Sequence, residues 1–265
     1  MERELQWKSV DNEFERSNYK MKKIFTDNMD SIKDEASINN KDTSLRGKVK
    51  FLDDEGNLLF EKDNLIVLRG RVFALEKMFN DDNNEGSYDK NLNREIVMFK
   101  IGTGGAPENN PFQPYTPEFS DLDIAQPIPF RVVDGNDADT TLTAEEENVY
   151  YDAKINSVDS TLTEYYGKRF DQQDPIWEID LANNEVYKKM IMKVDTKDFR
   201  TVPTGNPDQP FTREANINEL GLYFAFFNDT TNKMEDVELF SRLTFSTEPL
   251  SNLSKSITIE YYIFG

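Results

Sequence analysis

Three runs of β-forming residues within 216–265 constrain the fold more than any other part of the chain. The last run, 256–265, alternates isoleucine and tyrosine with more polar residues, the period-two pattern of a strand that buries one face. The first run, 220–227, is apolar on both faces, which is typical of a central strand. The polar residues 228–232 predict a turn before the second run, 238–246. We therefore predict a β-meander that completes the core.

The composition excludes several kinds of catalytic site. The chain has 265 residues with no cysteine and no histidine, so thiol nucleophiles, disulfides, Cys/His zinc sites and Ser-His-Asp triads are ruled out. Carboxylate pairs, lysine or tyrosine bases and oxygen-ligated Ca²⁺ or Mg²⁺ remain open. Because no residue pattern selects any of these, we predict no catalytic residue, no metal and no cofactor.

The charge balance bears on partners. A net charge of -19, from 50 acidic and 31 basic residues, repels nucleic acid on average, so we expect no sequence-specific nucleic-acid binding. The aromatic content of 12% argues against disorder for the bulk of the chain. There is no run of 18 apolar residues and no apolar signal core in M-E-R-E-L-Q-W-K, so we expect neither membrane insertion nor Sec export.

The first 45 residues read as a charged N-terminal arm without proline or glycine. Its apolar residues recur at spacings that share one side of a helix, which predicts an amphipathic helix over 11–35. Amphipathicity does not identify the partner, so packing on its own domain and packing on a neighbouring subunit stay equally open. In the second case the contacts would be made by Phe14, Met21, Phe25 and Ile32.

A hairpin and a helix are predicted next. Residues 48–62 read as two strands joined by the turn D-D-E-G-N at 53–57. A helix is predicted over 63–80, with Asp63 or Asn64 as its N-cap and with Gly70 providing room for close packing. Five apolar residues of this helix line one stripe: Leu65, Leu68, Val72, Leu75 and Phe79.

The rest of the chain is dense in predicted strands. A strand at 95–101 leads into a glycine-rich turn and then into a proline-rich, acidic stretch at 107–127, which we expect to run extended across a surface. Further strands are predicted at 129–133, 149–155, 176–181 and 186–194, with polar loops at 134–147 and 196–212. The predicted fold is mainly β (α+β): an antiparallel β-sandwich or barrel over 46–265 with one packed helix and an N-terminal helical arm over 1–45.

Two motifs suggest ligands and are better explained by structure. The turn G-T-G-G at 102–105 follows a strand, but no G-K-[ST] follows it and Pro107 replaces the helix that a phosphate loop requires. We interpret it as a structural turn whose glycines adopt positive φ. The acidic run 134–139, with Glu145 beyond it, breaks the EF-hand pattern at Ala138 and at Asp139, where glycine is required. It reads as a solvated loop.

A third feature is the small basic face that Arg69, Arg71 and Lys77 form on the predicted helix. In so acidic a protein the simplest interpretation of these residues is a set of surface salt bridges.

Three stretches together resemble structural proteins of tailed-bacteriophage virions. They are N-L-I-V-L-R-G-R-V-F-A-L-E-K-M-F at 64–79, F-K-I-G-T-G-G-A-P with N-P-F-Q-P-Y-T-P at 99–117, and the β-meander described above. They occur in order, and the arm and the loops lie outside the resemblance. The resemblance implies a subunit of a phage neck, tail or baseplate whose motif residues are structural, so it carries over no catalytic position.

The function implied is assembly. The chain would be a non-enzymatic subunit, made in the host cytoplasm, that forms a ring with copies of itself and with other virion proteins at the neck (the head-to-tail connector) or tail. Such subunits clasp neighbours through arms and extended loops. The candidate contacts are therefore the four arm residues above together with Pro111, Phe112, Pro114 and Tyr115. The acidic excess would suit a wall lining a DNA channel.

Two other functions stay open from the sequence. One is a carbohydrate- or receptor-binding β-sandwich at a tail tip or baseplate, which would use exposed tyrosines or Trp177. The other is a hydrolase with an acidic pair or a Ca²⁺ site, which no motif in the sequence supports.

Overall fold

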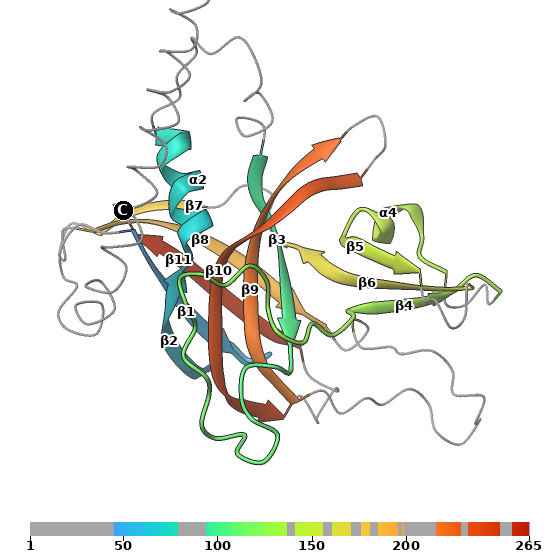
Figure 1. The fold of residues 1–265 in the computed structure, drawn as a ribbon, viewed down its shortest axis with the longest axis horizontal. Helices are drawn as coiled ribbons and strands as arrows, with labels where there is room; N and C mark the ends of the chain where they lie inside the picture. Colours follow the sequence, from blue (N-terminus) through green and yellow to red (C-terminus); the bar gives the residue numbers. More distant parts are fainter. Residues whose placement is uncertain are drawn as a thin grey trace, which may run out of the picture. The chain divides into compact units, whose positions relative to one another are not determined.

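The residues that the computed structural model describes all belong to the unit that begins at Leu45 (Figure 1). The predicted helix at 11–35 lies outside the described residues and stays a prediction. The described ranges are 45–78, 94–136, 141–155, 161–170, 176–180, 185–195, 198, 216–228, 233–249 and 256–264.

Within these ranges the fold is mainly β, as predicted. Eleven strands form one antiparallel sheet, and the described residues contain two helices. The strands are β1 (Arg46–Leu52), β2 (Leu58–Ile66), β3 (Arg94–Gly102), β4 (Arg131–Asp134), β5 (Tyr150–Ile155), β6 (Leu162–Arg169), β7 (Ile176–Asp180), β8 (Glu185–Val194), β9 (Asn216–Asn228), β10 (Lys233–Pro249) and β11 (Ile257–Phe264). The helices are α2 (Leu68–Met78) and α4 (Ala144–Glu147).

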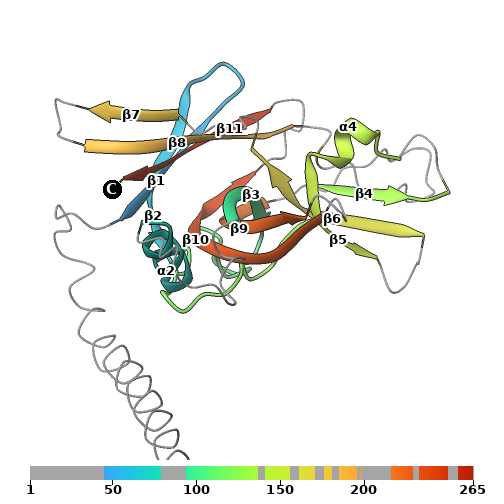
Figure 2. The same cartoon turned by 90° about the horizontal axis from the view of Figure 1, so that it is seen from above.

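The sheet folds over on itself at β2 to give a sandwich-like arrangement. Its strand order is β4-β6-β3-β9-β10-β2-β1-β11-β8-β7, with β5 on the other edge of β6. Most of β2 pairs with β1, whereas its last residues, Leu65 and Ile66, pair with Arg242 and Ser241 of β10. Figure 2 shows the two layers that result: β1, β11, β8 and β7 on one side, and β10, β9 and β3 on the other.

The core lies between these two layers. β9 sits between β3 and β10, as its apolar run predicted, and every described side chain from Ile217 to Ala225 is buried. Inward-facing residues of both layers belong to one apolar cluster, including Phe51 of β1, Met192 of β8 and Ile259 of β11 against Phe99 of β3, Leu222 of β9 and Leu243 of β10. Alternation along the strands therefore explains which side chains are buried.

Helix α2 covers one end of the core. Phe73 stacks on Phe224 of β9, with 4.3 Å between ring centroids, and lies edge-on to Phe240 of β10. Gly70 lets the helix approach this closely, since a Cβ on it would lie 2.1 Å from the carbonyl oxygen of Phe240. The close packing predicted at Gly70 is confirmed.

The predicted start of this helix is wrong. Residues 63–66 belong to β2, and α2 begins at Leu68. Asn64 pairs with Gly47 of β1, and its side-chain amide donates a hydrogen bond to the hydroxyl of Tyr261, so neither Asp63 nor Asn64 caps a helix. Pairing with distant strands outweighs the local capping preference here.

The predicted hairpin is confirmed. β1 and β2 are joined by a turn in which the carboxylate of Asp53 accepts backbone N–H groups from Glu55 and Asn57, at 3.0 and 2.7 Å. Gly56 adopts a φ of +83°, a conformation that other residues rarely adopt. The sequence D-D-E-G-N thus forms the turn because Asp53 accepts its backbone N–H groups and Gly56 adopts positive φ.

Two elements had not been predicted. β6 pairs with β4, β5 and β3 and so organises a small outlying part of the sheet. The predicted polar loop at 134–147 contains the short helix α4, which Thr143 and Glu146 begin with a capping box.

Buried tyrosines carry hydrogen bonds across the core. The hydroxyl of Tyr261, on β11, donates to Ser241 of β10 at 2.6 Å and accepts from Asn64 of β2, so one phenol ties the two layers together. On the outer side of β9, Tyr223 donates to the carboxylate of Asp123. Burial raises the pKa of both phenols, and for Tyr223 the negative charge of Asp123 adds to the effect.

We expect the fold to lose stability as the pH rises above 10. Below that pH both the folded and the unfolded chain hold the phenol protons. Above it the unfolded chain, whose tyrosines titrate at the ordinary value of 10.0, loses them first, because burial keeps the pKa of Tyr261 raised in the folded chain. Each such tyrosine contributes a slope of about 1.4 kcal/mol per pH unit.

Urea denaturation at about pH 8 and about pH 11, followed by circular dichroism and tyrosinate absorbance, measures this loss. Tyr261→Phe is the control and should make the loss smaller. Equal stability at both pH values would contradict the prediction.

Candidate assembly surface

The proline-rich segment 107–127, here called the strap, runs over the outer face of its own sheet. Leu243 and Phe245 of β10 point into the core, so the alternate residues Thr244 and Ser246 face outward. Their hydroxyls donate to two strap carbonyls, those of Tyr115 and Phe112 respectively. Figure 1 shows the strap looping along β10 and β9. The segment therefore crosses the surface of the sheet, but not in a continuously extended form, because its backbone closes turns between Pro107 and Asn110, Asn110 and Gln113, and Glu118 and Asp121.

The strap also reaches helix α2. The carbonyl oxygen of Phe119 accepts the N–H of Leu68 at 3.0 Å, which satisfies one of the N–H groups that a helix leaves unpaired in its first turn. The guanidinium of Arg71 lies 5.2 Å from the centre of the Phe119 ring. The strap and the helix therefore support each other.

A buried carboxylate anchors both ends of the strap. Glu219 of β9 has no exposed surface, and its carboxylate accepts the N–H groups of Gly104, Ala125 and Gln126 at 2.8–3.0 Å. Gly104 precedes the strap, whereas Ala125 and Gln126 lie near its end. One side chain thus holds the two ends of a 20-residue excursion together.

The cation that balances Glu219 comes from β10. Arg242 donates to Glu219 at 2.9 Å and to Asp121 of the strap at 3.0 Å. Burial by itself would lower the pKa of Arg242, but hydrogen bonding and attraction to Glu219 and Asp121 outweigh burial and raise it. Because Arg242 stays charged, the paired carboxylates of Glu219 and Asp121 hold the strap against the sheet.

The glycine-rich turn at 102–105 also helps to anchor the strap. The N–H of Gly105 donates to the side chain of Asn218 at 2.6 Å, and its carbonyl accepts the N–H of Tyr115 at 2.8 Å. A Cβ on Gly105 would lie 2.0 Å from the carbonyl oxygen of Asn218, and one on Gly102 or Gly104 would also collide with neighbours. The structural interpretation is therefore supported, but positive φ is not the reason, because among the described glycines only Gly56 adopts it. Lack of space is the reason.

A second polar cluster lies beside the strap. Lys100 of β3 is buried, and its ammonium lies 2.5 Å from the carboxylate of Asp152, 3.7 Å from that of Asp123 and 4.6 Å from the centre of the Tyr223 ring. Asp152 adopts a φ of +59° within β5. The cluster thus links β3, β5, β9 and the strap, and its charges are paired within the subunit.

Four of the eight predicted contact residues can be placed. Phe112 is 78% exposed and Tyr115 is also exposed, whereas Pro111 and Pro114 are half-buried. The prolines and the anchored carbonyls thus hold the backbone, while the two aromatic rings project into solvent. Phe14, Met21, Phe25 and Ile32 lie outside the described residues, so their part in the contact stays a prediction.

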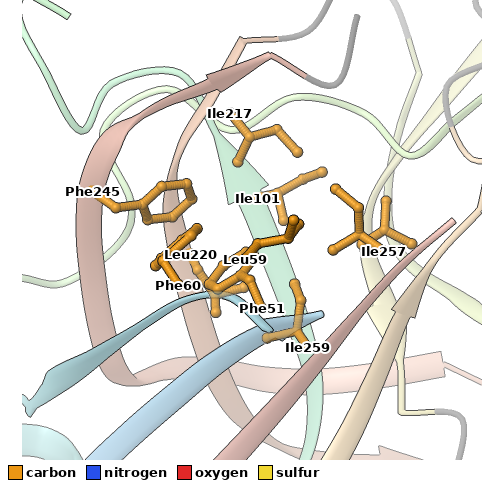
Figure 3. A pocket seen from close by; sticks show the side chains of 10 residues that line it. Phe51, Leu59, Phe60, Ile101, Ile217, Leu220, Phe245, Ile257 and Ile259 are labelled. Atoms are coloured by element: carbon orange, nitrogen blue, oxygen red, sulfur yellow. The ribbon is translucent and has the colours of Figure 1, made fainter. Parts of the chain in front are cut away.

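An apolar pit lies between the layers at the end of the core remote from α2. Ile217 and Leu220, at the start of β9, line it together with Phe245, while α2 packs on Phe224, farther along β9 (Figure 3). Its free volume of about 20 Å³ holds roughly one water molecule. Small-molecule sites have volumes of several hundred Å³, so this pit is a packing defect rather than a ligand site.

The acidic loop and the basic face can be placed in part, while residues 137–139 of the loop lie outside the described residues. In the acidic loop, Asp134 accepts the N–H of Asn136 and Glu146 belongs to the capping box. Within the described residues no three acidic side chains are placed to hold a metal ion. The helices of that part of the chain are too short or too polar to span a membrane. Of the basic face, Arg69 forms the predicted surface salt bridge, with Glu238 at 2.7 Å.

Glu219 and Arg242 were missed from the sequence, although a signal was present. Each has a buried apolar residue beside it, Leu220 after Glu219 and Leu243 after Arg242. A buried charge requires a partner, and a carboxylate and a guanidinium in neighbouring apolar runs are a plausible pair. No protein family, curated protein or solved structure matches this chain.

Proposed function

We propose that the protein is a non-enzymatic structural subunit of a phage particle, which assembles in a ring with copies of itself at the neck or tail. The observation that carries the proposal is the strap. It is pinned to its own sheet by Glu219, Arg242 and Thr244, and it presents the rings of Phe112 and Tyr115 to solvent. Rigidly held, exposed aromatic side chains are typical anchors of protein–protein interfaces.

Other features support an assembly role over a catalytic one. Two charged clusters, Glu219 with Arg242 and Lys100 with Asp152, are paired within the subunit and lie beside the strap. Rings need heterologous contacts, in which one surface of a subunit meets a different surface of the next. The strap supplies one such surface, and the resemblance of 64–79 and 99–117 to phage virion subunits supports the setting.

The acidic excess suits a ring that surrounds DNA. With 50 acidic against 31 basic residues, a lumen lined by this chain would repel phosphates and let DNA pass. The charge of the lumen in an imaged ring tests this part of the proposal, and a basic lumen would overturn it.

We expect the purified full-length protein to form closed rings, and Phe112→Ser to weaken them. Removing an exposed aromatic anchor deletes buried interface area without disturbing the core, so the variant should need about ten-fold more protein for half-assembly. Mass photometry over a concentration series, with negative-stain imaging, measures this.

Gln113→Ser, which shortens an exposed polar side chain of the same strap, is the control and should assemble normally. A wild-type protein that is monomeric at every concentration would contradict the self-assembly part of the proposal. Deletion of residues 1–40 should leave a folded subunit that no longer assembles, and complete rings from that deletion would show that the arm plays no part.

A further inference from the structure

Helix α2 exposes an apolar stripe to solvent. It packs on the core through Gly70 and Phe73. At 100° per residue, Leu68, Val72 and Leu75 lie on the opposite side, and all three are exposed, Leu75 by 54%. Three of the five residues of the predicted stripe thus share one exposed side of α2, which the helix does not use to pack on its own core, whereas Leu65 lies in β2 and Phe79 lies outside the described residues.

Three features mark this stripe as a binding surface. Its three members follow the i, i+4, i+7 spacing of a helix–helix contact. The helix that presents it is fixed, because Gly70 lies against β10 and the strap carbonyl of Phe119 holds the N–H of Leu68. Contiguous apolar side chains exposed on a rigid element are characteristic of interaction sites.

The sequence contains a matching partner in the N-terminal arm. Phe25, Met29 and Ile32 repeat the i, i+4, i+7 spacing of Leu68, Val72 and Leu75. An amphipathic helix that lays such a row along a complementary row is a common recognition mode. The predicted helix at 11–35 is longer than the exposed stripe, so it can cover the stripe completely.

Charge favours the same pairing. Helix α2 carries three cations, Arg69, Arg71 and Lys77, against one carboxylate, Glu76, and Arg69 is already paired with Glu238 of β10. The part of the arm that carries Met29 and Ile32, residues 26–35, has the opposite balance: Asp27, Asp30, Asp34 and Glu35 against Lys33. Complementary charge on the rims of an apolar contact fixes partner and register.

We propose that α2 of one copy is the docking site for residues 11–35 of a second copy. This inference rests on the proposed assembly function and deepens it, because it names the surface that the arm engages. Each subunit then gives one arm and receives another, which is the heterologous contact that a ring requires. The strap, which caps α2, would lie beside the same interface.

The first test places a charge on the stripe. Leu75→Arg should raise the protein concentration needed for half-assembly by about ten-fold or more, since a buried arginine without a partner disrupts an apolar contact. Leu58→Arg is the matched control, because Leu58 is 55% exposed, as Leu75 is 54% exposed, but lies in β2 beside the hairpin turn. It should assemble as the wild type does.

The second test identifies the occupant and uses the absence of cysteine from the chain. A Met29→Cys protein and a Val72→Cys protein that carries a mass tag are mixed and oxidised. Docking between copies predicts a disulfide-linked heterodimer as the main product. A mixture in which Asn57→Cys replaces Val72→Cys is the control and should give little heterodimer, since Asn57 lies in the hairpin turn.

The outcomes separate the two proposals. Rings that survive Leu75→Arg, or a heterodimer no more abundant than in the control mixture, would overturn this docking site while leaving ring assembly intact. A wild-type protein that stays monomeric, together with Met29→Cys and Val72→Cys proteins that give no more heterodimer than the control mixture, would overturn both. Loss of rings in Leu75→Arg but not in Leu58→Arg, together with the disulfide between Met29→Cys and Val72→Cys, supports both ring assembly and this docking site.

Discussion

Glu219→Ala should lower the free energy of unfolding by about 3–5 kcal/mol, the usual cost of breaking a buried ion pair by removing one partner. The carboxylate is fully buried and accepts three backbone N–H groups and the guanidinium of Arg242. Without it the N–H groups lose their acceptor, and Arg242 keeps only Asp121. Urea denaturation followed by circular dichroism measures the change.

Two variants make this result interpretable. Glu108→Ala removes an exposed carboxylate from the same strap and should change stability by no more than about 0.5 kcal/mol. Arg242→Ala combined with Glu219→Ala should cost less than the sum of the single changes, because each single change leaves a buried charge behind. A loss below about 1 kcal/mol for Glu219→Ala would mean that the carboxylate does not anchor the strap.

Gly105→Ala should cost about 3 kcal/mol, at the upper end of the range for overpacking. The added methyl group would lie 2.0 Å from the carbonyl oxygen of Asn218, which is backbone in the central strand β9 and cannot rotate away. Relief would require moving the turn, and that would break the hydrogen bonds of Gly105 to Asn218 and Tyr115. Thermal or urea denaturation measures the effect.

Gly56→Ala is the natural comparison for this experiment. A Cβ on Gly56 would have no atom within 4 Å, but φ is +83°, so the cost arises from backbone conformation alone, about 1 kcal/mol. If the two substitutions cost the same, the close approach at Gly105 would not be the reason for glycine there. A larger loss at Gly105, together with weaker ring assembly, would link the turn to the strap it begins.

Most strands could be predicted because alternating or continuous apolar residues are visible within a few neighbouring positions of the sequence. β9 was recognised as central from its apolar faces, and the β1–β2 hairpin from D-D-E-G-N. β6 was missed because its residues, L-T-E-Y-Y-G-K-R, are half-buried over most of its length and show little contrast between faces. Its position between β4 and β5 depends on pairing with distant residues, which periodicity does not reveal.

Helix α2 shows how a correct pattern can still mislead. The stripe of Leu68, Val72 and Leu75 was visible in the sequence, and an apolar stripe on a single helix is usually the face that packs. The core instead receives Phe73, with Gly70 permitting the approach. Residues 63–66 were predicted to begin the helix. They continue β2 instead, because they pair with β1 and β10.

The candidate surface was predicted only in part. Proline content indicated that the strap would run across a surface, and its residues Phe112 and Tyr115 are exposed. The anchoring by Glu219 was not predicted, since Gly104 and Gln126 are brought to one carboxylate by the three-dimensional path of the strap.

The position of β11 governs the order in which the subunit can form. This strand lies between β1 and β8, and its Tyr261 contacts Asn64, a residue 197 positions earlier in the chain. During synthesis the β1–β2 hairpin emerges long before β11. Until residues 257–264 have been made, one edge of β1 has no partner strand, and the core side chains Val49 and Phe51 lack their cover from β11. Distant pairings of this kind slow folding and leave strand edges open to association. A ribosome-bound chain of this protein thus carries an unfinished sheet for most of its synthesis.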